Sequence, residues 1–186
     1  RRNLNMVYII ENNGVYGLTK GQFSATSEEG LALKYHGTNP FKPVDICLEA
    51  IISNATFIAR SFAGDASQVK ELIKAAISHK GIAILDLISP CVTFNNKEDS
   101  HHSYAWSKEH EVQIHDVTYI PLQEEIMLED EFEPGTYKRI TLHDGSTIVL
   151  KKIEREYDPT DRAAALHMLD EAAQDEVLMT GLIYVD

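Results

Sequence analysis

The chain has 186 residues, of which 44% are hydrophobic and 25% are charged, and its formal net charge is −12 at pH 7. Such a length and composition are typical of a globular protein with a real core, and no apolar run approaches the roughly 20 residues of a membrane-spanning helix. The acidic balance argues against nucleic-acid binding, which needs patches of Lys and Arg.

The cysteines and the start of the chain add two expectations. Cys47 and Cys91 are too few for a disulfide framework, so we expect a reducing, cytoplasmic location. The sequence opens with Arg1-Arg2, has no Met there, and reaches its first apolar run at Val7. Because N-termini usually carry loose residues before the first core element, we expect an upstream part of the domain to precede this segment.

Strands and helices alternate in the first half of the chain. Short apolar, β-rich runs predict buried strands over residues 6–10, 56–60 and 82–88. Pro43 fits the first turn of a helix that runs through Ile51. A second, amphipathic helix precedes the third strand, with Asp65 as its expected N-cap and Gly81 as its expected C-terminal cap.

This order of elements predicts an α/β fold with a doubly wound, mostly parallel sheet and right-handed crossovers. Ligands of such sheets bind beyond the carboxyl ends of the strands. Two segments are expected at that edge, residues 11–26 and 89–95. Residues 14–42 contain several glycines and no helical period, so they are predicted to be a long loop region of the kind that carries function.

The second half is less regular. An acidic run over residues 124–133 is interpreted as a solvated linker, and we divide the chain into a domain over 1–123 and an extension over 124–186. The remaining expected elements are a short helix within 101–112, a hairpin over 137–141 and 147–151 with His143-Asp144-Gly145-Ser146 at its turn, and a helix from Thr160 or Asp161 through Gln174.

The segment after the first strand is the most informative. The side-chain oxygen of Asn13 and the backbone carbonyl two residues later are hard ligands of the kind that octahedral Mg²⁺ takes. Gly14 and Gly17 would let the backbone approach a phosphate, and Thr19 and Lys20 could bond its oxygens. From the residues alone, an ordinary Asn-Gly turn remains the alternative.

Cys91 follows the third predicted strand and therefore lies at the same edge of the sheet. A thiolate there could ligate an iron–sulfur cluster, if three more cysteines came from outside this sequence. The alternative is a small buried hydrophobic residue. Cys47 lies within a predicted helix and is expected to pack in the core.

The histidines invite a metal hypothesis that their spacing does not support. No triplet among them has a recognised ligand spacing, so we expect surface histidines. The residues concerned are His101, His102, His110 and His115.

The string Tyr16-Gly17-Leu18-Thr19-Lys20-Gly21-Gln22 resembles the cofactor loop of the β subunits of 2-oxoacid:ferredoxin oxidoreductases, which bind thiamine diphosphate. The segment around Cys91 also resembles this family, and similarity runs along most of the chain, weakest over 96–135. Ala25 stands where members often have Pro. The resemblance implies part of a thiamine diphosphate-binding fold, followed by a C-terminal hairpin-plus-helix extension.

The resemblance also implies roles for individual residues. Asn13 and the carbonyl of Val15 would hold Mg²⁺, and Cys91 would be the fourth ligand of a 4Fe–4S cluster. The other three cysteines, and the Gly-Asp-Gly that completes the magnesium site, would lie upstream. No catalytic residue is assigned to this chain, because the Glu that activates the aminopyrimidine comes from the α subunit in this family. The residues expected to line the diphosphate or the substrate carboxylate are Gly17, Leu18, Thr19 and Lys20.

The implied activity is the oxidative decarboxylation of a 2-oxo acid with coenzyme A, in which electrons pass through the cluster to ferredoxin. A tail over residues 136–186 resembles the 2-oxoglutarate type, and Lys20 is a candidate cation for the second carboxylate. Expected partners are the α subunit and ferredoxin, in a dimer of αβ heterodimers. Alternatives are an enzyme for pyruvate or for 2-oxo acids in general, a thiamine enzyme that does not use ferredoxin, and a non-catalytic scaffold.

Overall fold

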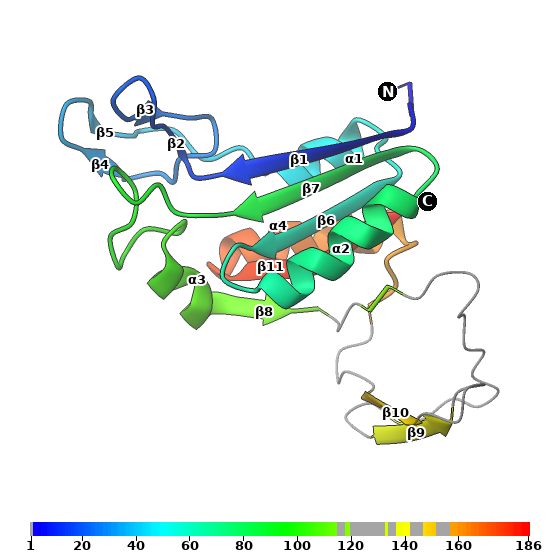
Figure 1. The fold of residues 1–186 in the computed structure, drawn as a ribbon. Helices are drawn as coiled ribbons and strands as arrows, with labels where there is room; N and C mark the ends of the chain where they lie inside the picture. Colours follow the sequence, from blue (N-terminus) through cyan, green and yellow to red (C-terminus); the bar gives the residue numbers. More distant parts are fainter. Residues whose placement is uncertain (1, 115–117, 120–132, 134–136, 142–146, 152–156) are drawn as a thin grey trace.

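A five-stranded sheet with the order β1-β7-β6-β11-β8 forms the centre of this computed structural model (Figure 1). The structure describes residues 2–114, 118–119, 133, 137–141, 147–151 and 157–186. The three strands at one side of the sheet run parallel, β11 is antiparallel to β6, and β8 is parallel to β11. The strands are β1 (Met6–Asn12), β6 (Phe57–Phe62), β7 (Ile82–Ile88), β8 (Glu111–Gln113) and β11 (Leu178–Val185).

Helices cover both faces of the sheet, as expected for a doubly wound fold. On one face, α1 (Ile46–Ile52) and α4 (Arg162–Gln174) pack on a buried cluster that includes Ile58 of β6. On the other face, α2 (Ala66–Ser78) packs on a second cluster that includes Leu85 of β7 (Figure 1). The apolar residues of β6 and β7 therefore alternate between two cores, which explains why both strands read as continuous apolar runs.

The strand register sets the position of the candidate site. Asn12 of β1 and Phe62 of β6 both pair with Ile88 of β7, so the three parallel strands end level at one edge. The loops that follow β1 and β7 lie beyond this edge, at the left of Figure 1. The sheet thus brings together two segments that are about 80 positions apart in the sequence, residues 11–26 and 89–95.

The region over 14–42 contains four short strands instead of a loop without regular structure. Two two-stranded pieces form there, β2 (Val15–Tyr16) with β3 (Gln22–Phe23), and β4 (Ala32–Leu33) with β5 (Gly37–Thr38). Val15, Leu31 and Leu33 are buried together, with Cys91 packed against them. This small core fixes the region after β1 against the segment after β7.

Most of the predicted boundaries are confirmed. Asp65 caps α2, since its carboxylate accepts a hydrogen bond from the backbone N–H of Gln68 at 3.0 Å. Asp161 caps α4 in the same way. The expected hairpin forms from β9 (Tyr137–Thr141) and β10 (Thr147–Lys151), which pair antiparallel. The short helix predicted within 101–112 is α3 (Tyr104–His110). The last two residues of the predicted range, Glu111 and Val112, belong to β8.

Two predicted helix ends are wrong. The first helix does not include Pro43: it begins at Ile46, because the carboxylate of Asp45 accepts the backbone N–H of Leu48 at 2.9 Å and ends the preceding extended chain. Gly81 does not cap α2, which ends at Ser78 with His79 as its C-cap. Gly81 instead permits a close approach, because a Cβ there would lie 2.4 Å from Oγ1 of Thr56.

Some expectations fall on the part of the chain that the structure does not describe. The acidic run over 124–133, apart from Glu133, and the hairpin tip at 142–146 lie outside the described residues. The division of the chain at residue 124 stays a prediction. Among the described residues, no helix combines the length and the apolar character that crossing a membrane requires.

Candidate functional site

The turn Asn13–Gly14–Val15 follows β1 directly. The Asn13 side-chain oxygen accepts a hydrogen bond from the backbone N–H of Val15 at 3.0 Å, and Gly14 has a φ of +70°. This is an Asx turn, in which Asn mimics a backbone turn and Gly supplies the left-handed conformation. Asn13 is half-buried and Val15 is buried, so the sequence-predicted ligands lie at the carboxyl edge of the sheet.

A buried polar chain holds the strand end in front of this turn. The Asn12 amide donates to Asp86 at 3.1 Å, and its oxygen accepts from the hydroxyl of Thr26 at 2.6 Å. Asp86 also accepts from Nε of Arg60 at 2.9 Å, and Arg60 reaches Asp45 at 2.7 Å. Burial acts to lower the pKa of Arg60, but the two carboxylates raise it well above its usual value, so the group is a cation. These contacts tie β1 to β6, β7 and the start of α1.

Polar residues of β1, β6 and β7 also border a cleft. Asn12, Arg60 and Asp86 line a hollow of about 820 Å³, which residues of α1 and α4 border as well. Its lining includes Asn12 and Ile88, the last residues of β1 and β7, so it reaches the carboxyl ends of these strands, where ligands of α/β sheets usually bind.

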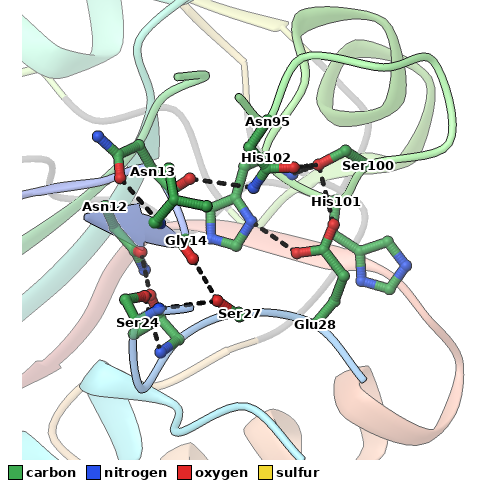
Figure 2. Close-up of polar contacts among 12 residues, drawn as sticks. Asn12, Asn13, Gly14, Ser24, Ser27, Glu28, Asn95, Ser100, His101 and His102 are labelled. Carbon is green, nitrogen blue, oxygen red and sulfur yellow. Dashed lines mark hydrogen bonds and ion pairs between the residues drawn. The ribbon is translucent and has the colours of Figure 1, made fainter. Parts of the chain in front are cut away.

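A second group of contacts holds the turn itself (Figure 2). The carbonyl oxygen of Gly14 accepts hydrogen bonds from the hydroxyl of Ser27 and from the backbone N–H of Ser24. The carbonyl oxygen of Asn13 accepts from the Asn95 amide at 3.0 Å. Both carbonyls are therefore engaged within the protein, and the turn is fixed from two segments of the chain.

Behind the turn lies a buried hydrogen-bonded pair of a carboxylate and an imidazole. Nδ1 of His102 lies 3.1 Å from Oε2 of Glu28, and the Ser100 hydroxyl donates to Oε1 of Glu28 at 2.9 Å. Burial acts to raise the pKa of Glu28, but the bonds from His102 and Ser100 outweigh it and lower the pKa to about 2. The amide of Asn39 donates to the carbonyls of Ser27 and Glu28 and holds this loop in place.

The prediction of surface histidines is wrong for His102, which is only 6% exposed. The carboxylate of Glu28 satisfies its ring, and this partner makes burial possible. His101 and His110 stack on either side of Trp106, with ring centroids 4.3 and 4.2 Å away. His115 lies outside the described residues.

The predicted cofactor loop projects from the small core. Leu18 is fully exposed, and Thr19 and Lys20 are exposed as well. The loop closes with a hydrogen bond from the backbone N–H of Gly21 to the carbonyl of Tyr16 at 2.9 Å, and Lys20 takes a left-handed φ of 76°. Its side chains are thus presented outward for a ligand or another chain.

Cys91 lies beside this loop. A Cβ built on Gly17 would be 3.5 Å from the sulfur of Cys91, so the backbone of the cofactor loop and the thiol are in contact range. Cys91 is half-buried, whereas Cys47 is fully buried and burial raises its pKa. The expectation that Cys47 packs in the core is confirmed.

The residues of the turn fit a bound Mg²⁺. The amide oxygen of Asn13 makes one hydrogen bond and keeps a second lone pair, and amide and carbonyl oxygens are ligands that Mg²⁺ accepts. Among the described residues, no group of three or more His, Cys, Asp and Glu could hold a metal. A metal at this edge would therefore depend on neutral oxygen ligands here and on ligands from outside the described residues.

Sequence reasoning did not find the polar residues that support the turn. Glu28 and His102 are 74 positions apart, and neither belongs to a recognisable motif. Asp86 gave a usable signal, since a lone charge within the apolar run over 82–88 indicates a buried ion pair.

Comparison with known proteins agrees with this architecture. Residues 1–87 match the family model described as thiamine pyrophosphate enzyme, C-terminal TPP binding domain. A β subunit of 2-oxoacid:ferredoxin oxidoreductase from Sulfolobus sp. is 48% identical over 97 residues, which cover 52% of this chain and 32% of that protein. The 2-oxoglutarate oxidoreductase subunit KorB of Mycobacterium tuberculosis is 39% identical over 100 residues, covering 52% of this chain and 26% of the relative.

A solved structure extends the likeness to the whole chain. The 2-oxoglutarate:ferredoxin oxidoreductase from Magnetococcus marinus, solved with 2-oxoglutarate, coenzyme A and succinyl-CoA bound, superposes with a TM-score of 0.70 at 26% identity. The alignment covers 100% of this chain and 49% of that one. The chain thus corresponds to only part of these relatives. Residues 1–87 are thus similar to the thiamine pyrophosphate enzyme C-terminal TPP binding domain, and the chain is similar to part of the β subunits of 2-oxoacid:ferredoxin oxidoreductases.

Proposed function

We propose that this chain is part of the β subunit of a 2-oxoglutarate:ferredoxin oxidoreductase that uses thiamine diphosphate. The observation that carries the proposal is the meeting of Gly17 with the sulfur of Cys91 beside the Asn13 turn. A cofactor loop and a cluster cysteine would have to lie this close for electrons to leave the cofactor. The names of the KorB relative and of the solved structure support the assignment to a 2-oxoglutarate oxidoreductase.

Each residue has a defined task in this proposal. Asn13 and the carbonyl of Val15 would hold Mg²⁺, which would neutralise the charge of the diphosphate. The backbone of Gly17, with Leu18 and Thr19, lines the diphosphate. When bound, thiamine diphosphate supplies the carbon nucleophile for decarboxylation of the 2-oxo acid. The exposure of the loop suits a site that is completed by a second chain, the α subunit.

Cys91 completes the ligand set of a 4Fe–4S cluster with three cysteines from outside this sequence. Such a cluster would supply one-electron transfer toward ferredoxin, and coenzyme A would accept the acyl group. The proposed assembly is a dimer of αβ heterodimers in the cytoplasm. The names of the KorB relative and of the coenzyme A-bound structure support, by analogy, the 2-oxoglutarate substrate, ferredoxin and coenzyme A.

The site is tested with Asn13→Ala in the full-length β subunit, assembled with its partner. Loss of one of few protein ligands should weaken binding of Mg²⁺ and thiamine diphosphate and abolish turnover. Titration calorimetry measures the binding, and Asn96→Ala, at an exposed position in the neighbouring loop, is the matched control. Unchanged affinity in Asn13→Ala would refute the assignment, and absence of binding in the wild type would favour a non-catalytic scaffold.

The substrate has a second candidate. The Sulfolobus relative carries the broader name 2-oxoacid:ferredoxin oxidoreductase, which favours activity on several 2-oxo acids. Lys20 decides between them if it binds the distal carboxylate of 2-oxoglutarate, because pyruvate lacks that group. Turnover of both substrates should be compared in the wild type and in Lys20→Ala. Selective loss of 2-oxoglutarate turnover supports the role of Lys20, equal losses remove it, and a wild-type preference for pyruvate overturns the substrate assignment.

A further inference from the structure

We propose that Glu28 and His102 are positioning residues for the magnesium site: they hold the turn Asn13–Gly14–Val15 in its ligating shape without touching the metal. The inference rests on the proposed function. It concerns two residues that lie outside the cofactor loop and that come from a different part of the sequence.

The first step is the contact between His102 and the turn. A Cβ built on Gly14 would lie 2.9 Å from Cε1 and 3.0 Å from Nδ1 of His102, and 2.8 Å from the Asn95 amide. The imidazole therefore lies directly against the backbone of Gly14 and limits how far the turn can move away from the sheet edge. Figure 2 shows the ring beside Gly14, with its contact to Glu28 on the other side.

The second step is the support of the ring itself. Glu28 lies 3.1 Å from Nδ1 of His102, and the Ser100 hydroxyl lies between the carboxylate of Glu28 at 2.9 Å and the side-chain oxygen of Asn95, so its single proton can be donated to either of the two. Glu28 and His102 are 7% and 6% exposed. A buried polar network of this kind restricts the motion of its members, and removal of one member leaves the others with unpaired polar groups.

The third step connects the network to the ligands on both sides of Gly14. Asn95 donates to the carbonyl of Asn13, and Ser27, the neighbour of Glu28, donates to the carbonyl of Gly14. The contacts of Asn95 and Ser27 thus end on the two peptide groups that lie between the proposed ligands, Asn13 and Val15. Outer residues that orient metal ligands typically change metal affinity about 10–100-fold when they are lost.

The experiment uses the full-length β subunit assembled with its partner, titrated with Mg²⁺ in the presence of saturating thiamine diphosphate. Glu28→Gln keeps the shape of the side chain but removes its charge. We expect it to raise the Kd for Mg²⁺ roughly 10–100-fold and excess Mg²⁺ to restore turnover. The matched control is Glu29→Gln, at the adjacent exposed carboxylate, which should bind Mg²⁺ as the wild type does.

Two less disruptive variants at Ser100 test the same inference if Glu28→Gln does not fold. Ser100→Ala removes one hydrogen bond to Glu28 and should weaken Mg²⁺ binding, whereas Ser100→Thr retains the hydroxyl and should rescue it. Wild-type Mg²⁺ affinity in Glu28→Gln or in Ser100→Ala would overturn the inference, as would weak activity that excess Mg²⁺ does not restore. Asn13→Ala distinguishes failure of the proposed magnesium site from failure of the positioning role of Glu28 and His102. If Asn13→Ala leaves Mg²⁺ binding intact, the magnesium site itself is misassigned.

Discussion

Replacing Gly14 by alanine tests how tightly the turn is held. The backbone there has a φ of +70°, and this conformation costs an L-residue about 1–2 kcal/mol. The new methyl group would also lie 2.8 Å from the Asn95 amide and 2.9 Å from His102, both buried. Overpacking of this kind costs about 1–3 kcal/mol, so the free energy of unfolding should fall by about 2–5 kcal/mol in total.

Gly37 is the matched control for this substitution. Its φ is +74°, but nothing lies within 4 Å of a Cβ built there, so Gly37→Ala bears the conformational cost alone. Urea titration of the full-length subunit measures both variants, and Gly14→Ala should be less stable than Gly37→Ala by about 1–3 kcal/mol. Equal losses in the two variants would show that Asn95 and His102 do not press against the turn. Glu28 and His102 would then not hold the turn in place.

Three further predictions concern other parts of the molecule. Cys91→Ala should lower cluster occupancy and leave thiamine diphosphate binding nearly intact; four irons per β subunit with an unaltered redox spectrum would contradict the assignment. Arg60→Met leaves Asp86 buried without its cation and should cost about 3–5 kcal/mol in urea unfolding. Lys74→Met breaks an exposed pair with Glu71 and should cost much less than Arg60→Met; equal losses of unfolding free energy in the two variants would refute this distinction. Because the folded-state pKa of Glu28 is about 2 against a usual 4.5, its contribution to stability should be complete above pH 4.5 and fade as the pH falls toward 2. Glu28→Gln should flatten that part of the stability profile, and an unchanged acid profile in this variant would count against the pair.

The parallel part of the fold could be predicted because its signals are local. The run over 82–88 is apolar on both faces, and the helix before it repeats apolar residues at helical spacing, so each element is specified within a short window. The place of β11 was not predictable in this way. Its apolar residues indicate burial, but its antiparallel pairing with β6 depends on a contact across more than a hundred positions.

Helix ends show where local rules compete. Pro43 and Asp45 are both typical of helix starts, and the structure uses Asp45, because its carboxylate binds Leu48 and also pairs with Arg60. The second of these contacts is tertiary and has no signature in the sequence around the helix. Gly81 looked like a cap because it follows an amphipathic helix, yet it is required by the close passage of Thr56.

In the candidate site, too, some residues could be predicted from the sequence and others could not. Asn13 and Cys91 could be found because strand ends meet at one edge of a parallel sheet, so residues that follow two strands are neighbours whatever their separation. Glu28 and His102 could not, since a buried carboxylate and a buried histidine look like surface residues until their partners are known. The sequence thus predicts which groups could ligate Mg²⁺, whereas the groups that would hold these ligands in place emerge only from the packing of two loops against each other. If Glu28 and His102 position the turn as proposed, the metal affinity of the site depends on residues that no local motif contains.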